Sequence, residues 1–437
     1  MSIQLLTLVL FCFLLLLFAL GLPVAFSLAT VVMVLGFFVW GPSAFGLIVH
    51  ATWGSMRSFV LVAIPLFILT GNILQYSGIA EAAYDMIHKW MGGLRGGLAM
   101  GTILICTAIA AMVGVIGAGI VTMGIIALPA MAKRKYDQKM AMGSIMAGGA
   151  LGALIPPSIA MILFANITQQ SVGKMFAGGI IPGVILSSLY MISIAIRCRR
   201  NPALGPALPS EERASWHEKF LALRGSILPA AIIVGVLGSI FLGIATPTEA
   251  AGVGVLGAII AALVYRKLRW KVVNASLIDT IRLSGMVMWI LIGAACFTRF
   301  YMAMGAADLI QGIVMASGLH PWAVLILMQL SLMFLGMIME DYAIVLVTAP
   351  IYTPIIAALG FNPLWFGILF MVNLQIAYLT PPFGFALFYM KGLVANKGIP
   401  MSEIWRAILP FIPIQVFGLG LVMIFPQLAL WLPGILF

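Results

Sequence analysis

The sequence predicts an all-α polytopic membrane protein, and its composition and hydropathy are the observations that predict it. Of the 437 residues, 63% are hydrophobic and only 8% are charged, and the mean hydropathy is +1.17. A soluble domain is usually about one quarter charged, so no soluble core could bury this much apolar surface. A transmembrane β-barrel would show strands of about ten residues with alternating hydrophobicity, and the sequence lacks that pattern.

Apolar stretches near the length of one membrane span, about 20 residues, follow one another along the chain. The first, 3–22, has neither a basic n-region nor an A-x-A cleavage site, so we expect a retained helix. Two stretches, 97–130 and 321–358, are too long for one crossing. Each predicts a re-entrant hairpin with an adjoining helix. Four scattered cysteines predict neither a disulfide framework nor a metal site: Cys12, Cys106, Cys198 and Cys296.

The net charge of +11 comes from basic residues that cluster in short loops. This is the distribution of the positive-inside rule rather than a nucleic-acid-binding patch. The polar segment 197–224 separates two halves of the chain and is expected in the cytoplasm together with the shorter basic loops. In the turn between the next two spans, Thr246 and Thr248 offer oxygens to cap a helix start. Glu249 suits the first turn of that helix.

An internal repeat flanks the polar segment. GALIPPSIAMILF (152–164) and AYLTPPFGFALFY (377–389) each place Pro-Pro shortly after a small residue, behind one of the overlong stretches. Proline removes a backbone donor, and broken backbone at membrane depth is tolerated only where it is buried in protein or lines a cavity. Interrupted spans at corresponding positions of two halves indicate the binding site of a secondary transporter. The freed carbonyl oxygens suit a small cation. The alternative is a simple kink in a packed helix, which two copies in register disfavour.

Ionisable residues inside apolar stretches are candidates for function. Glu340 and Asp341, in the second hairpin, either draw a cation toward the site or lie at a hydrated tip, and Glu340 is preferred for an electrostatic or structural role. Arg299 is expected to snorkel from a span end.

HExxH and Walker A motifs are absent, so we expect neither metalloprotease chemistry nor ATP hydrolysis. Polar residues near the broken helices either bond across helices or contact solute: Asn166, Thr168, Asn373 and Gln375.

Further stretches occur in order along the chain: SFVLVAIPLFILTGNIL (58–74), GVIGAGIVTMGIIALPAM (114–131), GALIPPS (152–158), SVGKMFAGGIIPG (171–183), GIATPTEAAGVGV (243–255), LGMIMEDYAIVLVTAPIYTPI (335–355) and NLQIAYLTPPFGFALFYMKG (373–392). Together they resemble the large membrane subunit of tripartite ATP-independent periplasmic (TRAP) transporters. The resemblance covers nearly the whole chain.

This resemblance implies a sodium-coupled importer that crosses the bacterial inner membrane several times. Such a subunit works with a small membrane subunit and with a soluble periplasmic solute-binding protein, which captures the solute, commonly a carboxylate. The family resemblance also implies an elevator, in which a mobile transport domain with two hairpins slides against a scaffold. Na+ is the implied coupling ion, no other cofactor is expected, and the chain is not expected to be an enzyme.

The resemblance also implies two sodium sites. The first comprises Val113, Gly114, Val115, Gly152, Ile155 and Pro157. The second comprises Gly336, Ala377, Thr380 and Phe383. Many family members resemble Ser-Gly-Ser where this chain has valines around Gly114, so the first site is expected to be weaker or to use carbonyl oxygens alone. Many also have glycine at the Ala377 position, where alanine keeps its carbonyl. Further candidates for solute contact or site electrostatics are Ser158, Asn166, Glu340 and Asn373.

The predicted organisation has six parts: scaffold helices in 1–96, a first transport repeat in 97–196, a cytoplasmic linker in 197–225, further scaffold helices in 226–318, a second transport repeat in 319–395 and a C-terminal helix in 396–437. One alternative is a stand-alone dicarboxylate or ion transporter of related architecture that needs no binding protein. A membrane-embedded enzyme would need a cluster of reactive groups at depth, and an assembly subunit would not need paired broken helices. The solute is left open.

Overall fold

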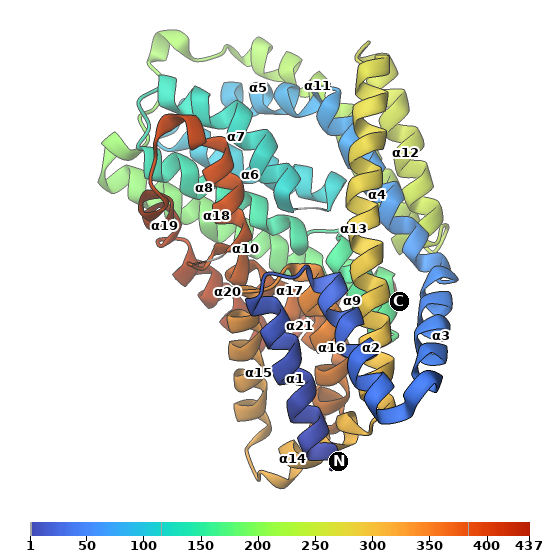
Figure 1. The fold of residues 1–437 in the computed structure, drawn as a ribbon. Coiled ribbons are helices and arrows are strands. Elements are labelled where there is room, and N and C mark those ends of the chain that lie inside the picture. The colour runs from blue at the N-terminus through green and yellow to red at the C-terminus, as the bar shows by residue number, and fades with distance from the viewer. Residues whose placement is uncertain (1, 115, 383) are drawn as a thin grey trace.

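The computed structural model describes residues 2–114, 116–382 and 384–437, and over these ranges the chain forms helices joined by turns, with no strand (Figure 1). Within the described ranges, seven helices are long and apolar enough to cross a membrane, or up to nine if each bent pair is one span. Several shorter apolar helices are the halves of hairpins and broken spans. The predicted all-α membrane fold is confirmed.

One group of helices, which we call the scaffold, includes α3, α4, α12 and α13, which lie on the right-hand side of Figure 1. The long helix α13 packs against α2, α3 and α4. The neighbouring helix α12 packs against α4 and α11. The scaffold consists of α1 (Ile3–Ala19), α2 (Val24–Trp40), α3 (Ala44–Met56), α4 (Ala63–Tyr76), α5 (Ile79–Met91), α11 (Trp216–Phe241), α12 (Pro247–Val264), α13 (Trp270–Ala303) and α14 (Ala306–Ala316).

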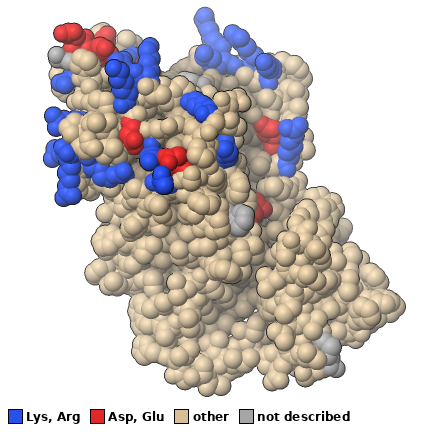
Figure 2. All heavy atoms as spheres, turned by 60° about the vertical axis from the view of Figure 1, so that its left-hand side comes forward, with Lys and Arg blue, Asp and Glu red and all other residues tan. Residues whose placement is uncertain are grey.

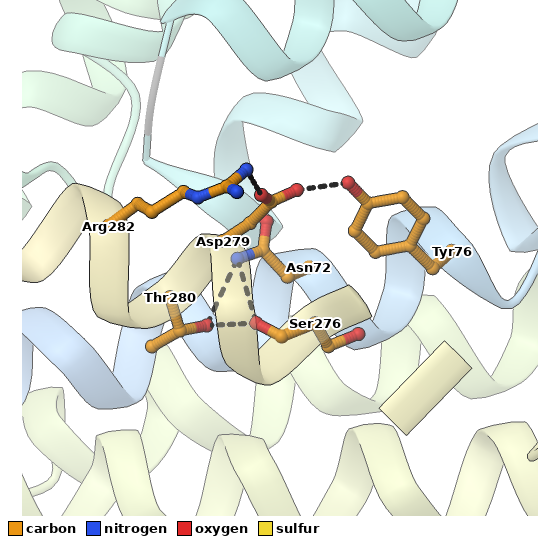
Figure 3. A network of polar contacts seen from close by, with 6 residues as sticks. All are labelled: Asn72, Tyr76, Ser276, Asp279, Thr280 and Arg282. Atoms are coloured by element: carbon orange, nitrogen blue, oxygen red, sulfur yellow. Dashed lines mark hydrogen bonds and ion pairs between the residues drawn. The ribbon is translucent and has the colours of Figure 1, made fainter. Parts of the chain in front are cut away.

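A polar network ties α4 to α13 inside the scaffold (Figure 3). The buried Asn72 amide donates to Thr280 Oγ1 at 3.0 Å, and the Thr280 hydroxyl donates to the Ser276 carbonyl at 2.6 Å. Nearby, the Tyr76 hydroxyl donates to the Asp279 carboxylate, which pairs with Arg282 at 3.5 Å. A buried amide without partners would be costly, so this network favours one fixed packing of α4 on α13.

The second group, which we call the transport group, contains both predicted hairpins and both broken helices. In the first repeat, α6 (Gly97–Val113) and α7 (Ile116–Lys133) form the hairpin, and α8 (Gln138–Ala150) and α9 (Ile159–Thr168) are the halves of the broken helix. In the second, the hairpin is α15 (Pro321–Gly336) with α16 (Asp341–Ala358), and the broken helix is α17 (Pro363–Leu379) with α18 (Phe385–Leu393). The group also includes α10 (Val172–Arg200), α19 (Met401–Ile408), α20 (Ile412–Ile424) and α21 (Gln427–Leu436).

The two repeats are inverted. The first hairpin returns to the basic loop 133–139, whereas the connections at the open end of the second, 317–320 and 359–362, contain no lysine or arginine. In Figure 1 the first hairpin lies in the upper half and the second in the lower half. On the face seen in Figure 2, lysines and arginines gather at the upper end and none is visible on the lower part. The positive-inside rule assigns the upper end to the cytoplasm.

Several local predictions can be compared directly with the helices. Thr246 Oγ1 accepts the Glu249 N–H, and the Glu249 carboxylate accepts the Thr246 N–H at 2.8 Å, so the predicted cap of α12 is confirmed as a reciprocal capping box. Thr248 does not cap the helix, because its hydroxyl donates to the Phe59 carbonyl at 3.2 Å.

Two predicted segments differ from the structure. The C-terminal region, expected as one helix in 396–437, contains α19, α20 and α21, because the prolines at Pro410 and Pro426 interrupt the helical hydrogen bonds. The linker expected at 197–225 is shorter, since α10 continues to Arg200 and α11 begins at Trp216. Shorter 3-10 turns occur at Gly41–Ser43, Phe59–Val62, Leu151–Ala153, Pro202–Leu204, Ser210–Glu212 and Ala395–Lys397.

Candidate functional site

The tip of the first hairpin lies against the first helix break. Gly114 ends α6 with a φ of +66°, a conformation that glycine adopts without a steric cost. A Cβ atom at Gly114 would collide with the carbonyl oxygen of Pro157. Two residues predicted for the first sodium site therefore lie in direct contact. Val115 lies outside the described residues, as does the side chain of Val113.

The first break runs from the 3-10 turn Leu151–Ala153, which contains Gly152, through a cis Pro156–Pro157 bond into α9. The Ser158 hydroxyl donates to the Ala153 carbonyl at 2.7 Å and accepts the Met161 N–H at 3.4 Å. Ser158 thus closes the break as a fully buried helix cap and, in this conformation, lines neither cavity described below.

The carbonyl oxygens of Ile155 and Pro157 are the groups that this break leaves available. Neither accepts a hydrogen bond from the part of the chain that the structure describes. Buried backbone carbonyls are normally paired, so a pair without partners beside a hairpin tip is chemically suited to a hard cation. Of the predicted oxygen set of Gly152, Ile155 and Pro157, the Pro157 carbonyl is the one that lies against Gly114.

The tip of the second hairpin likewise contacts the second broken helix. Gly336 ends α15, and a Cβ atom there would collide with the side chain of Ala377. Ala377 lies in the last turn of α17, where its carbonyl accepts the Thr380 N–H at 3.3 Å. The Thr380 hydroxyl donates to the Ile376 carbonyl at 2.6 Å, and its oxygen can still act as an acceptor or ligand. The Pro381–Pro382 bond that follows is cis, and Phe383 lies outside the described residues.

The Gly336–Ala377 contact gives a specific prediction. We expect Gly336→Ala to lower transport about tenfold, because overpacking a tight contact costs about 1–3 kcal/mol and displaces the tip. Adding Ala377→Gly to that variant removes the colliding methyl group and should restore transport to within about twofold. Transport rates of both variants and of Ala377→Gly alone, normalised to protein in the membrane, measure the coupling. Equal loss in the single and double variants would contradict this packing.

A cavity of about 700 Å³ lies between the scaffold and the transport group. We call it the arginine cavity, because Arg299 of α13 lines it and forms no ion pair with the described residues. The hydroxyls of Thr298 and Thr353 are buried without a hydrogen-bond partner there. Polar residues that line it are Ser55, Ser58, Asn166, Thr168, Gln169, Gln170, Thr298, Arg299 and Thr353.

Arg299 lies near the C-terminal end of α13, which ends at Ala303, as expected for an arginine near a span end. It is exposed to the cavity, and Gly54 of α3 leaves room for its guanidinium, since a Cβ atom there would lie 2.8 Å from Nη2. A guanidinium binds a carboxylate through two parallel N–H bonds. The sequence contained a signal for this residue, a lone arginine in the apolar second half of the 34-residue α13. What it lacked was the position of α3 and α16 opposite that arginine.

A second cavity, of about 450 Å³, adjoins the tip of the second hairpin. We call it the acidic cavity, because Glu340 and Asp341 line it and no lysine, arginine or histidine does so among the described residues. Glu340 thus lies near the second tip, where the sequence predicted an electrostatic role. The scaffold side is built from the start of α2 and the middle of α13, and the transport side includes Gly117, Tyr378 and Tyr389.

Other predicted polar residues separate into two pairs. Asn166 and Thr168 line the arginine cavity, where Asn166 Oδ1 accepts the Ser58 hydroxyl at 2.9 Å across the group boundary. Asn373 donates to the Gln329 carbonyl and to its side-chain oxygen, both at 2.7 Å, and so joins α17 to α15. Gln375 likewise accepts from Gln415 at 2.7 Å. Asn373 and Gln375 bond across helices and line neither cavity.

Comparison with known proteins identifies the family. The family model described as "Tripartite ATP-independent periplasmic transporter, DctM component" matches residues 11–428. The C4-dicarboxylate TRAP transporter large permease protein DctM of Pseudomonas aeruginosa is 35% identical over 377 residues, which cover 86% of each chain. The sialic acid TRAP transporter large permease protein SiaM of Vibrio cholerae is 30% identical over 420 residues, or 96% of each chain.

Two further comparisons support the same family and fold. The ectoine TRAP transporter large permease protein TeaC of Halomonas elongata is 31% identical over 424 residues, again 96% of each chain. The crystal structure of the YdaH transporter of Alcanivorax borkumensis shares the fold, with a TM-score of 0.65, 15% identity and coverage of 98% of both chains. The DctM, SiaM and TeaC relatives are named as large permease proteins of transporters, as expected for a protein that is not an enzyme. The chain belongs to the DctM family, the large permease subunits of tripartite ATP-independent periplasmic transporters.

Proposed function

We propose that this subunit imports an organic acid across the bacterial inner membrane, coupled to Na+ entry. The observation that carries the proposal is Arg299, a cation without an ion pair among the described residues, in a cavity between the scaffold and the second hairpin. A cation in a cavity that forms no ion pair needs compensation from water or from a ligand. A solute carboxylate, helped by the unpartnered Thr298 and Thr353 hydroxyls, would supply that compensation. Two of the relatives above are named for acids, a C4-dicarboxylate and sialic acid.

Sodium coupling is supported by two similar contacts, each between the tip of a hairpin and the helix break of the same repeat. Each joins a hairpin glycine to a proline-broken helix whose carbonyl oxygens are hard ligands. Sodium bound at both would hold tip and break together and so favour the state that accepts solute, because an ion shifts an equilibrium through its differential affinity. With valines flanking Gly114, the first site would rely on carbonyl oxygens and bind its ion more weakly.

An elevator movement is supported by the order of the cavities along α13. The acidic cavity includes Leu283 to Ile290 on the cytoplasmic side, and the arginine cavity includes Leu291 to Met302 farther along the same helix. Both lie between α13, which the Asn72 network fixes to α4, and the second hairpin. Sliding of the transport group along α13 would carry the hairpin tip from one cavity to the other.

The proposal assigns two partners to the chain, a small membrane subunit and a periplasmic solute-binding protein that delivers the solute. Purified membrane subunits in proteoliposomes test it, with a panel of radiolabelled organic acids, the binding protein and an imposed Na+ gradient. We expect uptake only when both the binding protein and the gradient are present. Uptake without the binding protein would favour the stand-alone alternative, and uptake indifferent to Na+ would contradict the coupling.

Thr380 provides a residue-level test of the second sodium site. We expect Thr380→Val to raise the Na+ concentration for half-maximal uptake about tenfold, which corresponds to about 1.4 kcal/mol for a lost oxygen ligand. Thr348→Val is the matched control, because the Thr348 hydroxyl makes the same bond to the carbonyl four residues back, at 2.7 Å, outside the site. Wild-type Na+ dependence in Thr380→Val would remove Thr380 from the site.

A further inference from the structure

We propose that the arginine cavity selects a monocarboxylate that carries several hydroxyl groups, rather than a dicarboxylate or an acid without further polar groups. This inference rests on the proposed function, because it takes the carboxylate of the solute to bind at Arg299. The chemistry of the rest of the solute then follows from the charge and the hydrogen bonds of the other side chains that line the cavity.

The charge of the lining allows one carboxylate. Among the described residues, Arg299 is the only charged side chain that lines the arginine cavity, and its guanidinium stays protonated. One guanidinium pairs with one carboxylate through two parallel N–H bonds. A second carboxylate on the same solute would give up its water without gaining a second cation, which is costly.

The two glutamines that follow α9 add hydrogen-bond acceptors to the lining. Gln169 Nε2 donates to the Asn166 carbonyl at 2.8 Å, and Gln170 Nε2 donates to the Thr168 carbonyl at 3.4 Å. A backbone carbonyl can pair only with the nitrogen end of a side-chain amide, so these bonds fix which end of each glutamine remains. The amide oxygens of both glutamines are therefore left to accept from a ligand or from water.

Three hydroxyl groups of the lining are in the same state. The hydroxyls of Ser55 and Thr168 each donate to the carbonyl four residues back, at 3.1 and 2.7 Å, and the Ser58 hydroxyl donates to Asn166 Oδ1 at 2.9 Å. Because each hydroxyl hydrogen is already used, the oxygen of each hydroxyl can only accept further bonds. The donors that remain in the lining are those of the side-chain amides, Thr298, Arg299 and Thr353.

A lining that mixes acceptors and donors around one cation suits hydroxyl groups. A hydroxyl both donates and accepts, so it can bond an amide oxygen and an amide nitrogen at once. A second carboxylate only accepts, and it would face the glutamine oxygens lone pair to lone pair. A plain alkyl chain would displace water from these polar groups and leave them without partners. At about 700 Å³, the cavity falls within the range of about 300–1,000 Å³ that is typical of pockets for drug-sized ligands.

Protection of a single cysteine by acids of defined structure tests this inference without Na+, the binding protein or transport. In the purified membrane complex in detergent, the exposed Cys12 is replaced by alanine, and Met302→Cys, at an exposed position of the cavity lining, is labelled with the neutral reagent N-ethylmaleimide. The competitors are gluconate, a polyhydroxylated monocarboxylate, and succinate, butyrate and uncharged sorbitol, all at equal ionic strength. We expect gluconate to halve the labelling rate at a concentration at least about tenfold below that of the others, the effect of one or two net hydrogen bonds.

Two sets of variants separate recognition of the hydroxyls from recognition of the carboxylate. Gln169→Met combined with Gln170→Met should raise the gluconate concentration for half protection several-fold and leave that of butyrate unchanged. Gln311→Met, on α14 outside both cavities, is the matched control and should change neither. Arg299→Gln should weaken protection by all three acids.

Several results would overturn the inference. These are protection by succinate or butyrate at least as strong as that by gluconate, no protection by any acid, an unchanged preference in the double glutamine variant, or no labelling at Met302→Cys and at Ala295→Cys. The proposed function would survive each of them, because its test is Na+-driven uptake of an acid delivered by the binding protein. Conversely, uptake indifferent to Na+ would contradict the coupling and leave the preference for gluconate standing.

Discussion

Arg299→Gln is expected to lower the uptake of an organic acid about 100-fold at limiting solute. Glutamine preserves much of the side-chain volume and removes the charge, so the loss reports the guanidinium–carboxylate interaction. Truncating one partner of a hydrogen-bonded charge pair costs about 2–5 kcal/mol, and about 3 kcal/mol corresponds to the stated factor. The measurement is initial uptake in proteoliposomes as a function of solute concentration, with the binding protein present.

Two further substitutions separate this effect from a general loss of positive charge. Arg57→Gln removes an exposed arginine at the end of α3 that does not line the arginine cavity, and it should keep near-wild-type uptake. Arg299→Lys should restore part of the activity, since lysine keeps the charge without the bidentate geometry. If Arg299→Gln transports like wild type, the arginine cavity is not the carboxylate site.

Gly114→Ala is expected to reduce Na+-dependent uptake by at least tenfold and to destabilise the first hairpin. Alanine at a φ of +66° costs about 1–2 kcal/mol. The added Cβ atom would also collide with the Pro157 carbonyl, one of the predicted sodium ligands. The tip must then withdraw from the break and separate the oxygen atoms of the first site. Uptake across a range of Na+ concentrations, together with thermal unfolding in detergent, measures both consequences.

Gly318→Ala is the matched control for backbone strain. Gly318 has a φ of +65°, and a Cβ atom there would meet nothing within 4 Å. It should show the cost of the conformation without the collision. If the two variants lose the same uptake and stability, the contact between tip and break has no role, and the first sodium site must lie elsewhere.

The sequence by itself determined the class of fold and the positions of both helix breaks. Low charge and long apolar stretches require a membrane protein, because no soluble fold buries so much apolar surface. The paired prolines at 156–157 and 381–382 located both breaks, and glycines marked both tips, because backbone chemistry is encoded locally. The same local reasoning failed at the C-terminus, where Pro410 and Pro426 were read as part of one span.

Only the tertiary structure decided what these elements face. That Gly114 contacts Pro157, and Gly336 contacts Ala377, depends on the docking of helices far apart in the chain. The sequence placed Arg299 near a span end, but it could not show that residues of α3, α9 and α16 line a cavity together with it. Glu340 and Asp341 read as a possible hydrated tip, because the aromatic wall opposite them comes from α2, α13 and α18. Charges and broken helices are properties of single segments, whereas a binding cavity exists only between segments.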